Sequence, residues 1–199
     1  MFNVLVNTEY EILFNDLQSG APNFFNLTMV DFSSSDEKLS SLLSSADAII
    51  GQVDLTDSQY KSAQRLRLIQ TLSAGFDRID LQKALYYKVM VATNNGANAN
   101  SVAEHVLMLI FSLFRQLLFH HYSVTNGPWK NLKYTNTELF GKTLGIYGLG
   151  RIGKEIAKKA SALGVKILYF DILRQYDLEK EMDIKYVFPD ELLKNSDIV

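Results

Sequence analysis

The stretch from Thr143 to Asp171, TLGIYGLGRIGKEIAKKASALGVKILYFD, constrains the fold more than any other part of this 199-residue chain. An apolar run is followed by Gly148, Gly150 and Gly153, after which the apolar spacing becomes helical. This order predicts a strand, a tight turn and a helix. A second apolar run, Val165 to Phe170, ends in Asp171 and predicts a second strand.

The three glycines and the acid together predict a dinucleotide site. Gly148 permits the turn, Gly150 lets the backbone approach a pyrophosphate, and Gly153 lets the helix pack on the strand. The phosphates would bind the N–H groups of the helix N-terminus, where the dipole favours negative charge. Asp171 lies 23 residues after Gly148, close to the spacing at which a carboxylate binds the ribose hydroxyls of NAD. We therefore expect NAD as the cofactor, although Arg174 nearby leaves NADP open.

The composition is that of an ordinary globular protein, with 47% hydrophobic and 21% charged residues. Because the net charge is only -2, we expect neither nucleic acid nor an anionic membrane as partner. The absence of cysteine excludes disulfides and sulfur-ligated zinc sites, and we identify no metal site. The most apolar stretch, Val106 to Phe111, is too short to span a bilayer. No targeting segment opens the chain, so the cytoplasm is the expected location.

The first half of the chain alternates between short apolar runs and segments with helical spacing. The apolar runs lie at Phe2 to Val6, Leu27 to Phe32, Ala46 to Gly51, Leu66 to Thr71 and Val89 to Ala92. Strands separated by helices imply a parallel sheet with right-handed crossovers, so the predicted fold class is α/β. Ser33 to Asp36 are the expected N-cap residues of the helix after the second run.

The segment from Asn94 to Asn100, NNGANAN, predicts a hinge or domain boundary, because glycine and asparagine favour turns. Ser101 and Glu104 then fit a capping box at the start of a helix. We expect this helix to continue to about Tyr122. Its apolar residues cover more than one face, which indicates burial between domains or between subunits.

Three segments carry a resemblance to a known family. They are LIQTLSAGFDRIDL at Leu68 to Leu81, NGANANSVAEH at Asn95 to His105, and GKTLGIYGLGRIG at Gly141 to Gly153. Together they resemble the D-isomer-specific 2-hydroxyacid dehydrogenases, which include D-lactate, glyoxylate and phosphoglycerate dehydrogenases. The resemblance implies a flavodoxin-like parallel-sheet substrate domain over residues 1–98 and a truncated Rossmann-type NAD-binding domain over 99–199. It also implies a homodimer built on the NAD domains and the long helix.

The resemblance also implies roles for individual residues. Ser73, Ala74 and Gly75 match the loop whose backbone amides hold the substrate carboxylate, and small residues after a strand can offer converging N–H groups to an anion. An ordinary strand-to-helix turn is the alternative. Val102 matches a position lining the nicotinamide pocket, though a core position suits it equally. Arg151 and Ile152 match the helix start that faces the pyrophosphate.

Hydride transfer to a 2-keto acid needs a cation beside the substrate and an acid that protonates the developing alkoxide. The family uses an arginine, a glutamate and a histidine, all in segments beyond position 199. We interpret His105 as a packing residue, and His120 and His121 as residues that close their helix and complement its dipole. No catalytic residue is therefore assigned within this sequence.

The leading hypothesis is the N-terminal part of an NAD-dependent D-2-hydroxyacid dehydrogenase that interconverts a small 2-hydroxy acid and its 2-keto acid. The 199-residue chain alone is expected to be inactive. A non-catalytic, NAD-responsive binding or regulatory protein on the same fold is the main alternative, since fold does not determine function. An inactive remnant is the third. The sequence does not specify which 2-hydroxy acid would be the substrate.

Overall fold

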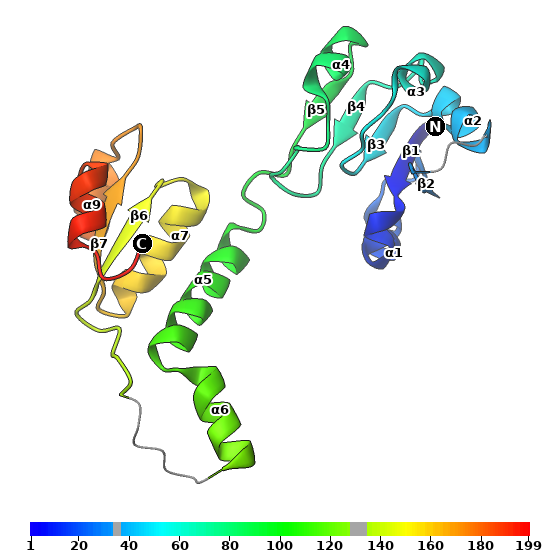
Figure 1. Cartoon of the computed structure of the whole chain (residues 1–199). Helices are drawn as coiled ribbons and strands as arrows, with labels where there is room; N and C mark the ends of the chain where they lie inside the picture. Colours follow the sequence, from blue (N-terminus) through cyan, green and yellow to red (C-terminus); the bar gives the residue numbers. More distant parts are fainter. Residues whose placement is uncertain (34–36, 128–134) are drawn as a thin grey trace. The chain divides into compact units, whose positions relative to one another are not determined.

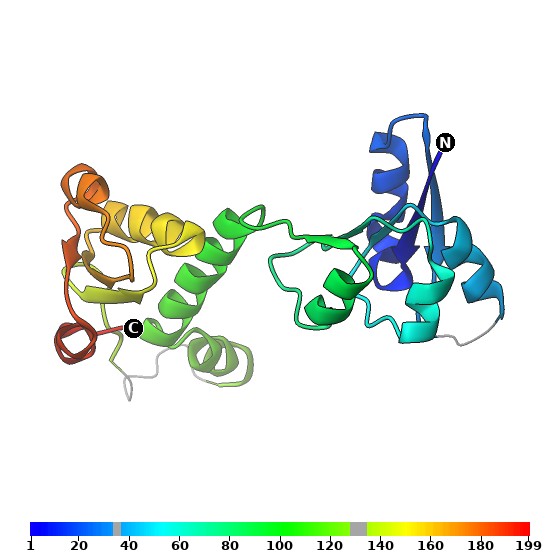
Figure 2. The same cartoon turned by 90° about the horizontal axis from the view of Figure 1, so that it is seen from above.

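The computed structural model describes residues 1–33, 37–127 and 135–199, which form two compact units, Met1–Ala97 and Asn98–Val199 (Figure 1). Each unit contains a parallel sheet with helices packed on it, and Figure 2 shows the same elements from above. The α/β class expected from the alternating pattern is confirmed.

The first unit is built on a five-stranded sheet in the order β2-β1-β3-β4-β5. Its strands are β1 (Phe2–Asn7), β2 (Phe25–Val30), β3 (Ala48–Ile50), β4 (Leu68–Gln70) and β5 (Met90–Ala92). All neighbouring strands pair in parallel. This is the strand order of flavodoxin-like sheets, in which ligands bind at the carboxyl ends of the strands.

The helices of the first unit are η1 (Thr8–Tyr10), α1 (Glu11–Gly20), α2 (Glu37–Ser45), α3 (Asp57–Ser62) and α4 (Leu81–Tyr86). Leu5, Ile49 and Ile69 from the sheet join buried residues of α2, α3 and α4 in one apolar core. Asp80 is the N-cap of α4, and its Oδ1 accepts from the amides of Gln82 and Lys83. Residues 34–36, which include most of the expected caps of α2, lie outside the described residues.

The second unit contains the strands β6 (Thr143–Tyr147), β7 (Lys166–Phe170) and β8 (Lys185–Tyr186), which pair in parallel in that order. On the other side of β6, Leu144 forms a parallel bridge with Ile198. The helices are α5 (Ala99–Phe114), α6 (Leu117–Asn126), α7 (Arg151–Ala162), α8 (Tyr176–Met182) and α9 (Pro189–Asn195). α7 packs beside α5 (Figure 1), and both contribute to the core of this unit.

The prediction of one helix running to about Tyr122 is wrong. α5 ends at Phe114, and α6 starts at Leu117 after a bend of 59°. Gln116 causes the break, because its φ of 48° lies in the left-handed region that a helix interior does not allow. Its side-chain Nε2 donates to the carbonyl oxygen of Thr135 over 3.0 Å, so a distant segment holds this conformation.

The predicted capping box at the start of α5 is also wrong. The helix begins at Ala99 with Asn98 as its N-cap, so Ser101 lies inside the first turn. Glu104 instead accepts a hydrogen bond of 3.1 Å from the side chain of Asn100. In the described ranges no single helix is long and apolar enough to cross a membrane, and α5 and α6 reach that length only as a bent pair.

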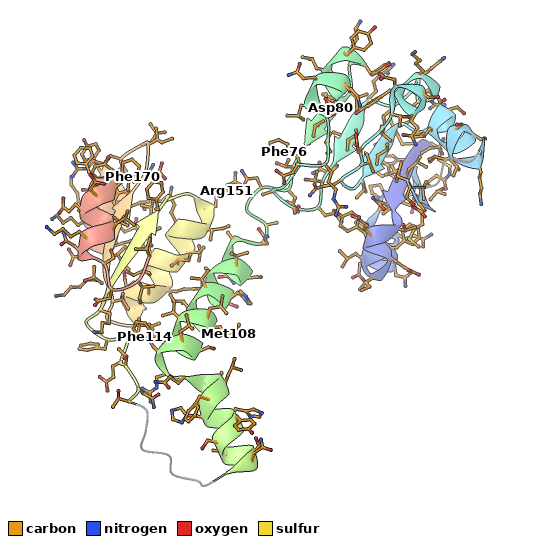
Figure 3. All side chains as sticks on the ribbon, viewed as in Figure 1. Phe76, Asp80, Met108, Phe114, Arg151 and Phe170 are labelled. Atoms are coloured by element: carbon orange, nitrogen blue, oxygen red, sulfur yellow. The ribbon has the colours of Figure 1, made fainter. Side chains whose placement is uncertain are left out.

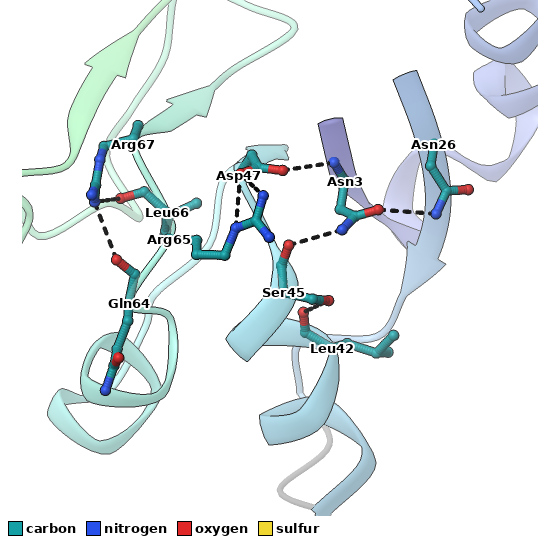
Figure 4. A network of polar contacts seen from close by, with 9 residues as sticks. All are labelled: Asn3, Asn26, Leu42, Ser45, Asp47, Gln64, Arg65, Leu66 and Arg67. Carbon is teal, nitrogen blue, oxygen red and sulfur yellow. Dashed lines mark hydrogen bonds and ion pairs between the residues drawn. The ribbon is translucent and has the colours of Figure 1, made fainter. Parts of the chain in front are cut away.

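A network of polar contacts ties together three strands of the first unit (Figure 4). Asn3 in β1 donates its backbone N–H to Oδ2 of Asp47 over 2.9 Å and its side-chain amide to Ser45 over 3.0 Å. Asn26 in β2 donates to Oδ1 of Asn3 over 3.1 Å. Arg65 binds Asp47 from the other side, with 2.9 Å between Nη2 and Oδ1. The Asn3 amide first, and then Arg65, hold the pKa of Asp47 below its usual value.

We expect Asp47→Asn to lower the free energy of unfolding by about 1–2 kcal/mol near neutral pH, because it weakens both hydrogen bonds to the charged group. The pKa of Asp47 is lower in the folded chain than its ordinary value of 3.8. The stabilisation is therefore present above that value and is lost as the pH falls through the folded pKa. Urea unfolding near pH 7 and at about pH 3 should show the difference from wild type shrinking at the lower pH.

The matched control is Asp16→Asn, which removes the same charge from an exposed position of α1. It should change stability by less than about 0.5 kcal/mol. An equal loss in both variants, or a loss for Asp47→Asn that does not depend on pH, would contradict a structural role for the Asp47 carboxylate.

Candidate functional site

The turn between β6 and α7 has a shape that only glycine allows at two positions. Gly148 has a φ of 104°, in the left-handed region that other residues rarely adopt. Gly153 lies so close to the end of β6 that a Cβ there would collide with the carbonyl oxygen of Gly148. The first turn of α7 therefore starts directly against the carboxyl end of β6, as the glycine spacing predicts.

Gly150 has a different role, because a Cβ at this position would meet no atom of the described chain within 4 Å. It is the N-cap of α7, and no side chain caps the helix there. The amides of a helix's first turn have no acceptor within the helix, so they are available to an anion. Arg151 and Ile152 in this turn are exposed, and Figure 3 labels Arg151 at the start of α7.

Leu149, between Gly148 and Gly150, holds the turn in place through both its side chain and its backbone. Its side chain is buried, with an exposed fraction of 1%, and its backbone N–H donates to Oδ2 of Asp171 over 2.7 Å. The sequence analysis did not single out this residue. The sequence did contain an indication of this role, namely an apolar residue between two glycines. Such a side chain can be buried only if the turn folds back on the sheet.

Asp171 follows β7 directly, next to the glycine turn. The amide of Gly148 donates to the carbonyl oxygen of Phe170 over 2.7 Å, which holds the ends of β6 and β7 side by side. The carboxylate also accepts from the amide of Leu173 over 3.3 Å. Each carboxylate oxygen keeps a further lone pair, which can accept a hydrogen bond from a ribose hydroxyl.

The geometry fits a dinucleotide. The open space at Gly150 leaves room for a group such as a pyrophosphate beside the backbone, and the positive end of the α7 dipole would complement its charge. Asp171 is oriented by two backbone amides at the same edge of the sheet. A pocket of about 490 Å³ between α5 and β6 reaches the turn at Gly148, Ile152 and Gly153, but Gly150, Arg151 and Asp171 do not line it. Val102, half-buried in the first turn of α5, does not line this pocket.

Arg174, three residues after Asp171, is engaged by its own chain. Its Nε and Nη2 each donate to one carboxylate oxygen of Glu179 over 2.8 Å. The hydroxyl of Tyr169 donates to the same glutamate over 2.8 Å. Hydrogen bonding by Arg174 first lowers the pKa of Glu179 to about 2, so this carboxylate is charged at any ordinary pH. The guanidinium lies over the rings of Tyr176 and Tyr186, 4.6 and 5.0 Å from their centroids.

The predicted substrate loop, Ser73, Ala74 and Gly75, follows β4 at the carboxyl edge of the first unit's sheet. The carbonyl oxygen of Ser73 accepts from the amide of Asn94 over 3.1 Å and from the hydroxyl of Thr71. Ala74 is exposed, whereas Ser73 and Gly75 are half-buried. The loop is thus fixed by the carbonyl on its strand side and open at its tip.

Gln52, which the sequence analysis did not single out, lies beside this loop and is bound by Asn7. Gln52 follows β3, and its carbonyl oxygen accepts from the side chain of Asn7 at the end of β1 over 3.4 Å. Its Nε2 atom lies 3.3 Å from the point where a Cβ on Gly75 would be. Both residues lie at the carboxyl ends of predicted strands, where the ligands of parallel sheets bind. Their positions in the sequence could therefore have marked them as candidate site residues.

The histidine interpretations need correction. His105 is exposed on α5, so it is not a buried packing residue of the described chain. His120 and His121 lie in the first half of α6, which continues to Asn126, so they do not close a helix. The Nε2 atom of His120 lies 3.1 Å from Oδ1 of Asn136. Across the described ranges, no three histidine, aspartate or glutamate side chains gather in a way that could hold a metal ion.

Comparison with known proteins agrees with this geometry. Residues 107–199 match the family model for the NAD-binding domain of D-isomer-specific 2-hydroxyacid dehydrogenases. A glyoxylate reductase of Pyrococcus furiosus is 31% identical over 172 residues, which are 82% of this chain and 51% of the relative. A glyoxylate reductase of Thermofilum pendens is 38% identical over 143 residues, or 69% of this chain and 42% of the relative.

A solved structure of the D-lactate dehydrogenase of Aquifex aeolicus, complexed with NAD and lactic acid, is similar at 30% identity with a TM-score of 0.77. The similarity covers 98% of this chain and 59% of that structure. The chain spans about half the length of the curated glyoxylate reductases it matches. With the glycine turn and its acid in the matched domain, residues 107–199 belong to the NAD-binding domain family of the D-isomer-specific 2-hydroxyacid dehydrogenases.

Proposed function

We propose that the second unit binds NAD(H) at the turn between β6 and α7. The observation that supports this proposal is the hydrogen bond from Leu149 N to Asp171, because it holds a carboxylate one residue before the N-cap of α7, which no side chain caps. Gly150, Arg151 and Ile152 would face the pyrophosphate, and Asp171 would accept from the ribose hydroxyls. Val102 is proposed to border the nicotinamide, because it matches that position of the family.

We propose that the protein interconverts a small D-2-hydroxy acid and its 2-keto acid. Bound NAD(H) would supply or accept the hydride. The carboxylate of the substrate would bind the backbone amides of Ser73, Ala74 and Gly75, at the edge of the sheet where parallel folds bind ligands. The family relation supports this proposal, since relatives of this chain are glyoxylate and hydroxypyruvate reductases.

Two further proposals concern the protein as a whole. We propose a homodimer formed through α5 and α6, because these helices leave several large apolar side chains exposed. They are Met108, Leu109, Phe111, Leu113, Leu117, Leu118, Tyr122 and Val124. Its mass in solution tests this proposal. A cytoplasmic location is likewise proposed, and cell fractionation can check it.

Substitutions at two of the glycines, Gly153 and Gly150, should separate an effect on folding from an effect on binding. Gly153→Ala forces the first turn of α7 away from β6, so we expect a loss of about 1–3 kcal/mol in the free energy of unfolding. Gly150→Ala meets open space at a φ of -74°, and its stability should stay within about 1 kcal/mol of wild type. Its methyl group would, however, lie where the pyrophosphate approaches. Urea unfolding and NADH fluorescence titration measure the two effects, and normal NADH affinity in Gly150→Ala would contradict the proposed pyrophosphate site.

Asp171→Ala should weaken NADH binding about tenfold, because the ribose loses a charged hydrogen-bond acceptor. NADPH should lose less, because the carboxylate that repels its 2′-phosphate is gone. The ratio of the NADPH and NADH dissociation constants should therefore fall. Asp177→Ala, at an exposed position of α8, is the control with the same charge change. An unchanged ratio in Asp171→Ala refutes the ribose role.

The activity is tested by NADH-dependent reduction of glyoxylate, hydroxypyruvate and pyruvate. We expect the 199-residue chain to bind NADH without turnover, because no residue within it is assigned as catalytic. The protein purified from its native source should reduce at least one of these acids, and its intact mass should be compared with 22.5 kDa. A well-folded native protein that binds NADH and reduces none of them would rule out the dehydrogenase and favour a regulatory role.

A further inference from the structure

Arg174 is the only cation in the loop from Asp171 to Gln175, and Glu179 holds it. We infer that Glu179 determines cofactor specificity by keeping Arg174 away from the 2′-position of the bound ribose, so that the site does not bind the 2′-phosphate of NADP. This inference rests on the proposed binding of NAD(H). It assigns the preference for NAD to two separate groups, Asp171 and Glu179.

The chemistry of the two cofactors explains why Arg174 matters. NADP differs from NAD by one phosphate on the 2′-oxygen, and Rossmann-type sites that accept it use an arginine near the end of the second strand. A guanidinium binds phosphate through two parallel hydrogen bonds. Arg174 follows Asp171 by three residues, and the Leu173 amide between them already donates to the Asp171 carboxylate. Its backbone is therefore close to the acid that would contact the ribose.

The contact with Glu179 occupies one of the two guanidinium edges through which Arg174 could bind a phosphate. Nε and Nη2 form one edge of the guanidinium, and both are bound to the glutamate at 2.8 Å. The guanidinium carbon also lies 4.6 Å from the ring centroid of Tyr176 and 5.0 Å from that of Tyr186. A phosphate that takes the Nε–Nη2 edge would have to displace the paired carboxylate, and drawing the whole group to the ribose would cost its contacts with these rings.

Glu179 is itself held from the core of the unit. The hydroxyl of Tyr169, a residue with an exposed fraction of 0%, donates to Oε1 of Glu179 over 2.8 Å. The same hydroxyl accepts from the backbone amide of Gln175 over 2.9 Å. The loop that carries Arg174 and the helix that carries Glu179 thus share one buried anchor, so the ion pair is part of the folded unit.

The test is a fluorescence titration with NADH and NADPH of variants made in an Asp171→Asn background, which removes direct repulsion of the phosphate. Adding Glu179→Gln should lower the ratio of the NADPH and NADH dissociation constants about tenfold, because it frees a charged bidentate donor. Glutamine keeps an acceptor for the Tyr169 hydroxyl, and thermal unfolding reports whether the fold is intact. Competition by 2′,5′-ADP against 5′-AMP isolates the phosphate contribution.

Two controls separate release of Arg174 from a general change in charge. Glu181→Gln removes the same charge from an exposed position of α8, and it should move the ratio less than about twofold, since salt screens exposed charges. Adding Arg174→Gln to the Glu179→Gln variant should abolish the gain. An equal gain with Glu181→Gln, a gain that persists without Arg174, or an unchanged ratio in folded Glu179→Gln each overturns the inference.

Arg174→Gln in the otherwise wild-type chain provides a test that does not require Glu179→Gln to fold. The ratio should stay unchanged, because Arg174 contributes nothing to nucleotide choice while Glu179 holds it. A selective loss of NADPH binding in this variant would show that Arg174 already contacts the phosphate, and the inference would be wrong. If the wild-type chain binds neither nucleotide, the proposed function fails as well, whereas NADH binding with an unaltered ratio in Glu179→Gln refutes the inference alone.

Discussion

The close approach of α7 to the end of β6 is the constraint on which the second unit depends. It requires a residue without a side chain at Gly153, because the carbonyl oxygen of Gly148 occupies the space of a Cβ. Once that contact is made, the buried side chain of Leu149 and its hydrogen bond to Asp171 leave the turn one orientation. The proposed anion site is therefore made chiefly of backbone, and its side chains contribute mainly by fixing where that backbone lies.

In the first unit, a polar network lies at the amino ends of the strands, and the loop proposed to bind substrate lies at their carboxyl ends. At the amino ends of its strands, Asn3 and Asp47 form the network that ties β1, β2 and β3 together. At the carboxyl ends, the Ser73 carbonyl is bound while the tip of its loop stays open. Parallel sheets favour this division, because all strands end at the same edge and the loops there are free of the hydrogen bonds of the sheet.

The sequence predicts those features that local rules determine. Alternating periodicity predicts the α/β class, and the requirement for missing side chains at Gly148 and Gly153 predicts the turn. The break at Gln116 could not be predicted in the same way, because the contact with Thr135 that holds it lies 19 residues away. The mistaken role of His120 and His121 follows from that missed break. The sequence identifies Arg174 as a cation near Asp171. Its pairing with Glu179 could not be predicted, because it depends on the path of the loop and on the hydrogen bond from Tyr169.

Tyr169 belongs both to the apolar core of the second unit and to the polar group that orders the loop after β7. Its ring packs among apolar residues, where substitutions that conserve the total volume are tolerated best. Its hydroxyl, however, has two partners at fixed positions. A substitution in this core that moves Tyr169 would therefore also disturb its hydrogen bonds to Gln175 and Glu179. The packing of the core and the conformation of the loop after β7 are thus constrained together.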